Sequence, residues 1–223
     1  MSPAVASHYF TSVTPFIDEP VLKSSPEFPV TIAGLTLRFV TGKGVFSKGS
    51  LDEGSQILIE YLPPQLGPTF LDLGCGWGPI SAFVAARDPG IQVFGVDINP
   101  RATQLARFNL INNHLANGHF WCGHGVAACR SGGFTSVACN PPVRAGNEVI
   151  GELFAGAHRV LAPGGTLWVV LRTAQGAKSW QKKLAAAFGN CETVAIESGY
   201  RILRSQKAVG AALPELTEGF EGA

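Results

Sequence analysis

The sequence predicts an α/β fold in which a seven-stranded, mainly parallel, doubly wound sheet is covered by helices on both faces. Short apolar segments alternate with amphipathic helical segments, a pattern typical of parallel strands that are buried on both sides. The chain has 223 residues and a hydrophobic fraction of 46%, which suits one domain with a sizeable core. The predicted strands are 69–73, 91–97, 119–122, 134–139, 166–171, 192–196 and 200–208.

The N-terminal part is expected to form an extension that carries a short β-hairpin. Residues 1–29 predict a lead-in with one short helical turn, and residues 30–40 predict the hairpin. A loop with three glycines follows at 41–51. Asp52 is the expected N-cap of a helix that Pro63-Pro64 ends.

After this helix, strands and helices alternate along the chain. Pro79 and Pro100 are typical first residues of helices, and Asn99 is a typical N-cap. Two further helices are expected at 148–160 and 177–188. The last two predicted strands are joined by Glu197-Ser198-Gly199, so the sheet is expected to end in an antiparallel strand.

We expect a single domain over 1–208, in which the extension and hairpin (1–62) precede a Rossmann-like core (63–208), and a disordered tail at 209–223. A net charge of +1 gives no whole-molecule attraction to nucleic acid, so such binding would need a local patch. Five cysteines without CxxC spacing and five scattered histidines favour a reducing compartment and no metal site. Because no signal peptide or membrane-spanning segment is visible, we expect a cytoplasmic protein without a membrane partner. The oligomeric state is not predicted.

A glycine-rich turn follows the strand at 69–73, in the run Asp72-Leu73-Gly74-Cys75-Gly76-Trp77-Gly78-Pro79. Ligands of doubly wound sheets bind at the carboxyl ends of the strands, where glycines let the backbone approach them closely. Pro79 stands where a dinucleotide fingerprint has its third glycine. Asp72 would repel a pyrophosphate but suits the cationic amino group of a methionine moiety. Asp97, about 20 residues further on, can accept both ribose hydroxyl hydrogens. The alternative interpretation is a generic tight turn with a capping acid.

Asn140-Pro141-Pro142 follows the strand at 134–139, so it lies at the same edge of the sheet. An exocyclic or amide nitrogen is a poor nucleophile because its lone pair is delocalised. Two hydrogen-bond acceptors on its NH₂ group hold that lone pair toward a methyl carbon, and the Asn140 side-chain oxygen and the Pro141 carbonyl suit this task. Such a transfer needs alignment rather than a strong base or a metal. The alternative is a simple loop start after a strand.

The runs D-L-G-C-G-W-G-P and V-D-I-N resemble motif I and the following acid of class I S-adenosylmethionine-dependent methyltransferases. The resemblance implies S-adenosyl-L-methionine as cofactor, with its methionine half on Asp72 and the glycines, its ribose on Asp97 and its adenine on Ile98. His124 stands where the family often has an acid near the adenine amino group, although a surface histidine is an equal alternative. The expected cofactor-binding residues are Asp72, Gly74, Cys75, Gly76, Gly78, Asp97, Ile98, Asn99, His124 and Asn140.

Asn140-Pro141-Pro142 also resembles the signature of amino-methyltransferases that act on adenine, guanine or glutamine amides, with Val143 in place of the usual aromatic residue. The segments 44–55 (G-V-F-S-K-G-S-L-D-E-G-S) and 140–146 (N-P-P-V-R-A-G) resemble those of RsmC-like small-subunit (16S) ribosomal RNA guanine-N2 methyltransferases. This likeness runs from about 8–10 to 205, and it is greater to shorter single-domain relatives than to members with an additional N-terminal domain. It implies methyl transfer to the exocyclic N2 amine of a guanine, with ribosomal RNA or the small subunit as partner.

The expected catalytic residues are Asn140, Pro141 and Pro142, and the expected substrate-binding residues are Phe46, Ser47, Asp52, Val143 and Arg144. By resemblance Phe46, Ser47 and Asp52 close over the ligands, whereas on the residues alone Ser47 and Asp52 are loop and cap residues. Because Val143 is not aromatic, Phe46 or Trp121 is expected to stack on a flat acceptor, although Trp121 is equally a core residue. A phosphate-binding rim, or merely scattered surface charge, is expected from Lys43, Lys48, Arg144, Arg172 and Lys178. A guanine acceptor must be single-stranded or flipped out to reach the site.

Other functions stay open at this point. A protein glutamine amide or a small molecule is an alternative acceptor for the same chemistry, although Val143 disfavours the glutamine amide. An NAD-dependent oxidoreductase is disfavoured by Asp72 and Pro79. A non-catalytic RNA-binding scaffold is disfavoured by the intact Asn140-Pro141-Pro142.

Overall fold

The structure is a computed structural model, and it describes residues 19–47 and 49–210. The beginning of the expected lead-in, including 8–10, and the rim residue Lys48 lie outside the described residues. Of the tail predicted to be disordered, residues 211–223 also lie outside them.

The core is a seven-stranded sheet with the strand order β5-β4-β3-β6-β7-β9-β8. Its strands are β3 (Thr69–Leu73), β4 (Gln92–Asp97), β5 (Gly118–Cys122), β6 (Phe134–Cys139), β7 (Leu161–Arg172), β8 (Glu192–Glu197) and β9 (Tyr200–Gln206). The neighbours from β5 to β7 are parallel, and β9 is antiparallel to both β7 and β8. The predicted mainly parallel sheet with an antiparallel C-terminal strand is therefore confirmed.

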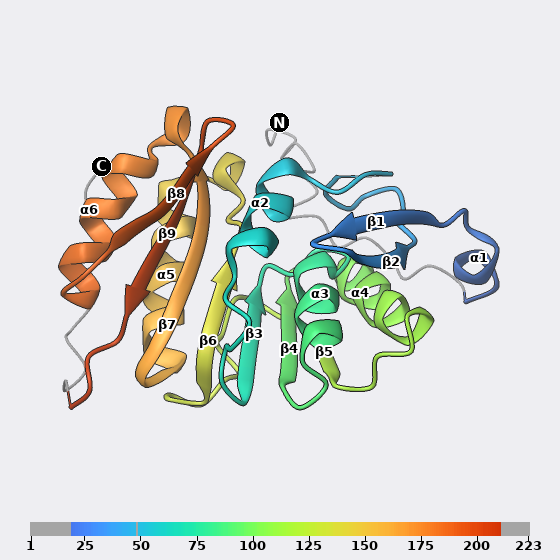
Figure 1. The fold of residues 1–223 in the computed structure, drawn as a ribbon, viewed down its shortest axis with the longest axis horizontal. Helices are drawn as coiled ribbons and strands as arrows, with labels where there is room; N and C mark the ends of the chain where they lie inside the picture. Colours follow the sequence, from blue (N-terminus) through green and yellow to red (C-terminus); the bar gives the residue numbers. More distant parts are fainter. Residues whose placement is uncertain (1–18, 48, 211–223) are drawn as a thin grey trace, which may run out of the picture.

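Helices cover both faces of this sheet (Figure 1). The helices are α2 (Glu53–Tyr61), α3 (Pro79–Arg87), α4 (Pro100–Asn112), α5 (Asn147–Val160) and α6 (Ala177–Phe188), with short 3-10 turns at Val143–Ala145 and Thr173–Gln175. One buried cluster joins the apolar faces of α2, α3 and α4, with Leu58 and Phe83 fully buried in it. A second cluster lies under α5 and α6 and includes Phe154 and Trp180. The two clusters fill the space between the sheet and the helices on its two faces, as a parallel sheet that is buried on both sides requires.

β7 begins earlier than the predicted strand at 166–171. Leu161 already pairs with Phe134 of β6, and the register shifts before Ser136 pairs with Thr166. Pro163-Gly164-Gly165, whose composition is typical of a turn, also bonds along the sheet, because Gly164 N donates to Lys207 O at 2.8 Å and Lys207 N donates to Gly165 O at 2.9 Å. The turn residues are thus a bulged part of the strand.

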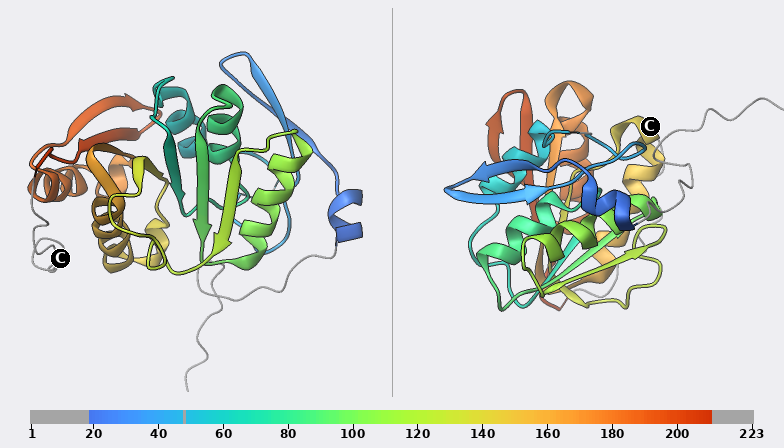
Figure 2. Two further views of the ribbon diagram at one scale, coloured as in Figure 1. Left: turned by 90° about the horizontal axis from the view of Figure 1, so that it is seen from below. Right: turned by 90° about the vertical axis from the view of Figure 1, so that its right-hand side faces the viewer.

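The N-terminal hairpin of β1 (Phe28–Ile32) and β2 (Leu35–Phe39) confirms the predicted extension, and the helical turn before it is α1 (Glu19–Ser24). α1 and α6 lie at opposite ends of the molecule, as the left view of Figure 2 shows. Among the described residues, no helix has the length and apolar character needed to cross a membrane. Within the same residues there is no group of three His, Cys, Asp or Glu side chains that could hold a metal ion.

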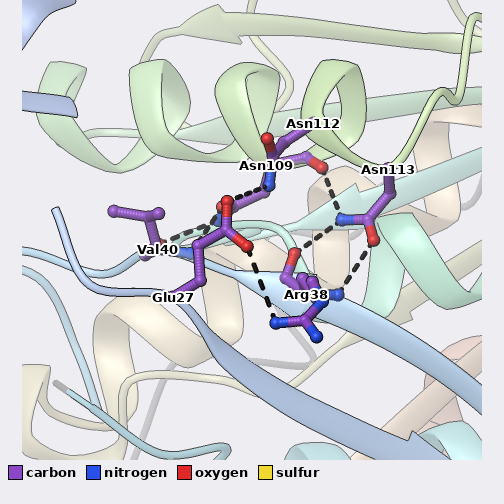
Figure 3. A network of polar contacts seen from close by, with 6 residues as sticks. All are labelled: Glu27, Arg38, Val40, Asn109, Asn112 and Asn113. Carbon is purple, nitrogen blue, oxygen red and sulfur yellow. Dashed lines mark hydrogen bonds and ion pairs between the residues drawn. The ribbon is translucent and has the colours of Figure 1, made fainter. Parts of the chain in front are cut away.

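Asn109 of α4 and Asn113, the C-cap residue of that helix, attach the end of the hairpin to the core (Figure 3). Asn113 accepts from Arg38 N at 2.9 Å and donates to Arg38 O at 2.6 Å, and Asn109 makes the same pair of bonds with Val40 at 2.8 and 3.0 Å. Four residues of helix advance by about 6 Å, and two residues of strand by about 6.6 Å. The two side-chain amides therefore match alternate residues of the extended chain and bond to it as a neighbouring strand would.

Candidate active site

A cavity of about 870 Å³ opens at the carboxyl edge of the sheet, within the range of typical ligand pockets of roughly 300–1,000 Å³. Its lining comes from the loop before α2, from the ends of β3, β4, β6 and β7, from the loop after β5 and from one face of α5. The predicted site residues that line it are Phe46, Ser47, Asp52, Gly74, Gly76, Asp97, Ile98, Asn99, His124, Asn140, Pro141, Pro142, Val143 and Arg144. Of the expected rim, Arg144 and Arg172 line the cavity, whereas Lys43 and Lys178 do not.

The turn after β3 brings backbone to the cavity at two of its three glycines. Gly74 and Gly76 have positive φ values of 82° and 55°, and a Cβ added to either would meet no atom within 4 Å. Gly78 differs, because a Cβ there would lie 2.8 Å from Cβ of Ala106 in α4. The third glycine therefore permits helix packing and does not line the cavity. Cys75 is buried and borders only a small adjoining hollow.

Asp97 lies at the end of β4 with its carboxylate fixed by the backbone. One oxygen accepts from Gly76 N at 2.9 Å and the other from Asn99 N at 2.8 Å. Burial raises the pKa of this carboxyl, and the two backbone hydrogen bonds oppose that shift. Each oxygen keeps a further lone pair, as two ribose hydroxyl donors require. The next residue, Ile98, leaves 44% of its surface exposed in the cavity wall, which suits contact with a flat apolar face.

Asp72 joins β3 to α3 from a buried position. Its side chain is 1% exposed and does not line the cavity. One oxygen accepts from Ser81 N at 3.1 Å and from Ser81 Oγ at 2.7 Å, while the other is buried without a partner among the described residues. Burial raises the pKa of Asp72 to about 7, against the opposing effect of the Ser81 hydrogen bonds. The carboxyl therefore ties β3 to the first turn of α3, and its direct contact with a cofactor stays a prediction.

On the other side of the cavity, the Asn140 amide is held in one orientation. Its Nδ2 donates to Asp52 Oδ2 at 2.6 Å and to Ser55 Oγ at 2.9 Å. Because a carboxylate only accepts hydrogen bonds, the atom that faces Asp52 is the amide nitrogen. Both amide hydrogens are used, and Oδ1 has no protein partner in the described part of the chain. That oxygen is therefore the acceptor that Asn140 offers to a ligand.

The residues after Asn140 form a tight inverse γ-turn. Pro142 has φ −75° and ψ 77°, and Val143 N donates to Pro141 O at 2.9 Å. This bond holds the Pro141 carbonyl and leaves its second lone pair for a further donor. Two acceptors, the Asn140 side chain and the Pro141 carbonyl, thus lie on consecutive residues of one cavity wall.

The first turn of α2 organises this side of the cavity. The sequence leaves Asp52 either as the N-cap of α2 or as a site residue, and the structure gives it both roles. The oxygen that accepts from Asn140, Oδ2, also accepts from Ser55 N at 2.8 Å. Glu53 forms an ion pair with Arg172 at 3.6 Å. Gly54 lies against Tyr200, where a Cβ would approach ring atom Cε1 to 2.9 Å. Ser55 and Tyr200 were not predicted as site residues from the sequence; the D-x-G-S spacing was the available signal for Ser55.

The loop at 41–51 is attached to the elements that carry the glycine turn and Asp97. Asn99 Nδ2 donates to Gly44 O at 2.7 Å, and Arg101 donates to Lys43 O at 2.7 Å. Trp77 Nε1 donates to Phe46 O at 3.1 Å. These bonds hold Phe46 in the cavity wall with 41% of its surface exposed, whereas the other candidate for stacking, Trp121, packs against the second buried cluster.

The arrangement fits S-adenosylmethionine. The open space at Gly74 and Gly76 lets a ligand lie close to the protein backbone. Asp97 offers acceptors for a ribose, and Ile98 offers an apolar surface. The bound cofactor supplies an electrophilic methyl group. On the facing wall the protein offers two hydrogen-bond acceptors, Asn140 Oδ1 and Pro141 O.

Comparison with known proteins supports this interpretation. Residues 36–204 match the family described as methyltransferase small domain. YbxB of Bacillus subtilis (strain 168) is 30% identical over 206 residues, which cover 91% of this chain and 100% of YbxB. Ribosomal RNA large subunit methyltransferase G of Aeromonas hydrophila is 32% identical over 170 residues, which cover 73% of this chain and 44% of that protein.

Solved structures agree on the fold. The T. thermophilus 16S rRNA N2 G1207 methyltransferase RsmC, in complex with AdoMet and guanosine, matches with a TM-score of 0.71 and 27% identity over 82% of this chain and 50% of that one. The cyclase SpnF shares the fold at a TM-score of 0.58 and 20% identity, so the fold alone does not determine the chemistry. The chain thus spans about half the length of the named ribosomal RNA methyltransferases it matches. It belongs to the methyltransferase small domain family and is a class I S-adenosylmethionine-dependent methyltransferase.

Proposed function

We propose that this enzyme methylates the exocyclic N2 amine of a guanine in 16S ribosomal RNA. The observation that carries the proposal is the orientation of the Asn140 amide. Since Asp52 and Ser55 take both amide hydrogens, Oδ1 is presented as an acceptor beside the Pro141 carbonyl. A primary amine on a flat ring has two hydrogens to donate to this pair, and its lone pair is then directed out of the plane of those bonds.

The choice of guanine N2 rests on similarity. The structural relative RsmC is named for the N2 position of a 16S guanine and was solved with guanosine, and the chain resembles that family at 44–55 and 140–146. Large-subunit ribosomal RNA is the second candidate acceptor, because curated relatives that are 31–33% identical carry the name ribosomal RNA large subunit methyltransferase G. In either case ribosomal RNA is the proposed partner.

The test is transfer of labelled methyl from S-adenosylmethionine to under-methylated small subunits, large subunits, naked RNA and total protein, offered side by side. We expect label in small-subunit RNA, recovered as N2-methylguanine. Asn140→Ala should lower the rate by about 100-fold or more, because the acceptor amine loses its alignment. Its affinity for S-adenosylhomocysteine, measured alongside, separates this loss of alignment from a loss of cofactor binding, in which Asn140 is also an expected participant.

Asn112→Ala is the matched control, because it removes the same side chain from a position in α4 outside the cavity. It should transfer methyl at the wild-type rate. Label in large-subunit RNA would move the acceptor to the second candidate. Label only in protein would refute the RNA acceptor and favour a glutamine amide.

A further inference from the structure

Arg172, the last residue of β7, has an ordered guanidinium in the cavity wall. Its central carbon lies 4.5 Å from the centroid of the Tyr200 ring, and its Nε donates to the Tyr200 hydroxyl at 2.8 Å. Its Nη2 lies 3.6 Å from a carboxylate oxygen of Glu53. Even so, 51% of the Arg172 side chain is exposed. The group is therefore fixed by two neighbours and open to the cavity.

Tyr200 itself cannot be the exposed stacking surface. It is only 6% exposed, and α2 approaches its ring so closely that Gly54 has no room for a Cβ. The ring instead supports Arg172, which is paired with Tyr200 across the β7–β9 ladder. The planar surface that this pair offers to the cavity is the guanidinium.

Position in the sheet places Arg172 on the acceptor side of Asn140. β6, which ends before Asn140, lies between β3 and β7. On one side of β6, the glycine turn follows β3 and Asp97 ends β4. On the other side of β6, Arg172 ends β7. Cys139 pairs with Val169, so Arg172 lies one strand over from Asn140 and two residues further toward the cavity. With strands about 4.8 Å apart and a rise of about 3.3 Å per residue, the two backbones are about 8 Å apart, which a flat ring between the two side chains can bridge.

The surroundings of Arg172 favour stacking over phosphate binding. Its Nε is already bonded to Tyr200, and Glu53 offsets its charge and would repel a phosphate. Guanidinium groups are planar and weakly hydrated, and unstacked bases stack on them in RNA recognition. Val143 in the same cavity leaves the usual aromatic position without a ring.

We propose that Arg172, held by Tyr200 and Glu53, is the surface on which the acceptor base stacks, in place of an aromatic residue after the two prolines. The inference rests on the proposed function, since it presumes a flat acceptor. It makes Arg172 a binding residue for the acceptor ring, and it makes Tyr200 and Glu53 positioning residues that act through Arg172.

The test measures the Kd of guanosine by saturation-transfer NMR with the protein saturated with S-adenosylhomocysteine. Arg172→Ala should weaken guanosine binding by about tenfold, which is the scale of one lost base stack. Arg172→Lys should weaken it similarly, because lysine keeps the charge but not the plane. The Kd of S-adenosylhomocysteine should stay within about twofold in both variants, which also shows that they are folded.

Arg107→Ala is the matched control, because it removes an exposed arginine of α4 that does not line the cavity. It should bind guanosine as wild type does. Adding Val143→Phe to Arg172→Ala should restore much of the lost affinity, since a ring at that position faces the same cavity.

Wild-type affinity in Arg172→Lys would overturn the proposal, because charge alone would then suffice. Wild-type affinity in Arg172→Ala, or no guanosine binding by the wild-type protein, would also overturn it. In each case methyl transfer to RNA, measured separately, would leave the proposed function standing. Conversely, guanosine binding that depends on Arg172 without any transfer to RNA would support the stacking surface and refute the RNA acceptor.

Discussion

Replacing Asp52 by serine should separate the two tasks of its carboxylate. Oδ2 of Asp52 caps α2 through Ser55 N at 2.8 Å and orients Asn140 through Nδ2 at 2.6 Å. A serine hydroxyl is a good N-cap, but its side chain is one atom shorter and cannot reach both partners. Asp52→Ser should therefore keep the helix and lose the orientation of the amide, whereas Asp52→Ala should lose both.

The magnitudes follow from the two bonds. A lost N-cap costs about 1 kcal/mol, which lowers Tm by about 2–4 °C in a chain of this size, so this decrease is expected for Asp52→Ala. Asp52→Ser should melt within about 2 °C of wild type. A hydrogen bond to a charged group contributes about 1.5–3 kcal/mol, and a tenfold change in rate corresponds to 1.36 kcal/mol. Both variants should therefore lose about 10- to 150-fold in kcat/KM for the acceptor.

The assay is steady-state methyl transfer to the acceptor that the wild-type enzyme uses, together with thermal unfolding and titration with S-adenosylhomocysteine. The cofactor titration is needed because Asp52 and Asn140 also border the hollow that Gly74, Cys75 and Gly76 line. Near-wild-type kcat/KM in Asp52→Ser would show that Asn140 does not need this bond. A large loss of cofactor affinity would show that Asp52 serves the other ligand.

Three further changes test other parts of the structure. Asn140→Asp places a carboxylate beside that of Asp52, so one of the two groups must hold a proton. Methyl transfer at pH 8 should therefore be lost. Adding Asp52→Asn should restore part of it, because the new amide donates the hydrogen bond that Asn140 donates in the wild type. The pKa of Asp72 is raised from 3.8 to about 7 in the folded protein, chiefly by burial, so the stability it contributes is present below about pH 4 and lost as pH rises to 7. The difference in Tm between Asp72→Asn and wild type should therefore grow in favour of the variant from pH 5 to pH 8, and a constant difference would contradict the shift. Asn109→Ala leaves the buried backbone groups of Val40 without partners, so it should cost about 3 kcal/mol and lower Tm by about 6–12 °C; a decrease under about 3 °C would contradict this anchoring role.

The sequence predicted the elements of this fold well because their signals are local. The N-caps Asp52 and Asn99 and the helix-initiating prolines at 79 and 100 act on neighbours within one turn, and each begins a helix in the structure. The strand at 134–139 has the predicted bounds. In contrast, the long β7 depends on pairing with distant residues, which an apolar run does not reveal.

The site was predicted in part for the same reason. The glycine turn, Asp97 and Asn140 follow strand ends, so strand prediction alone places them at one edge. The contact between Asp52 and Asn140 joins residues 88 positions apart, and Tyr200 comes from an antiparallel strand at the end of the chain. The environment of Asp72 was unpredictable because it depends on which side chain fills the space beside it.

Asp52 and Ser55 bond to Asn140, Glu53 pairs with Arg172, and Gly54 lies against Tyr200. These four contacts fix the rotation of α2 about its own axis, which is its phase. Successive residues of a helix are rotated by about 100°, so one residue inserted after Asp52 would turn Glu53, Gly54 and Ser55 away from their partners. A sequence search for the same arrangement should therefore require the four residues Asp-x-Gly-Ser without an insertion.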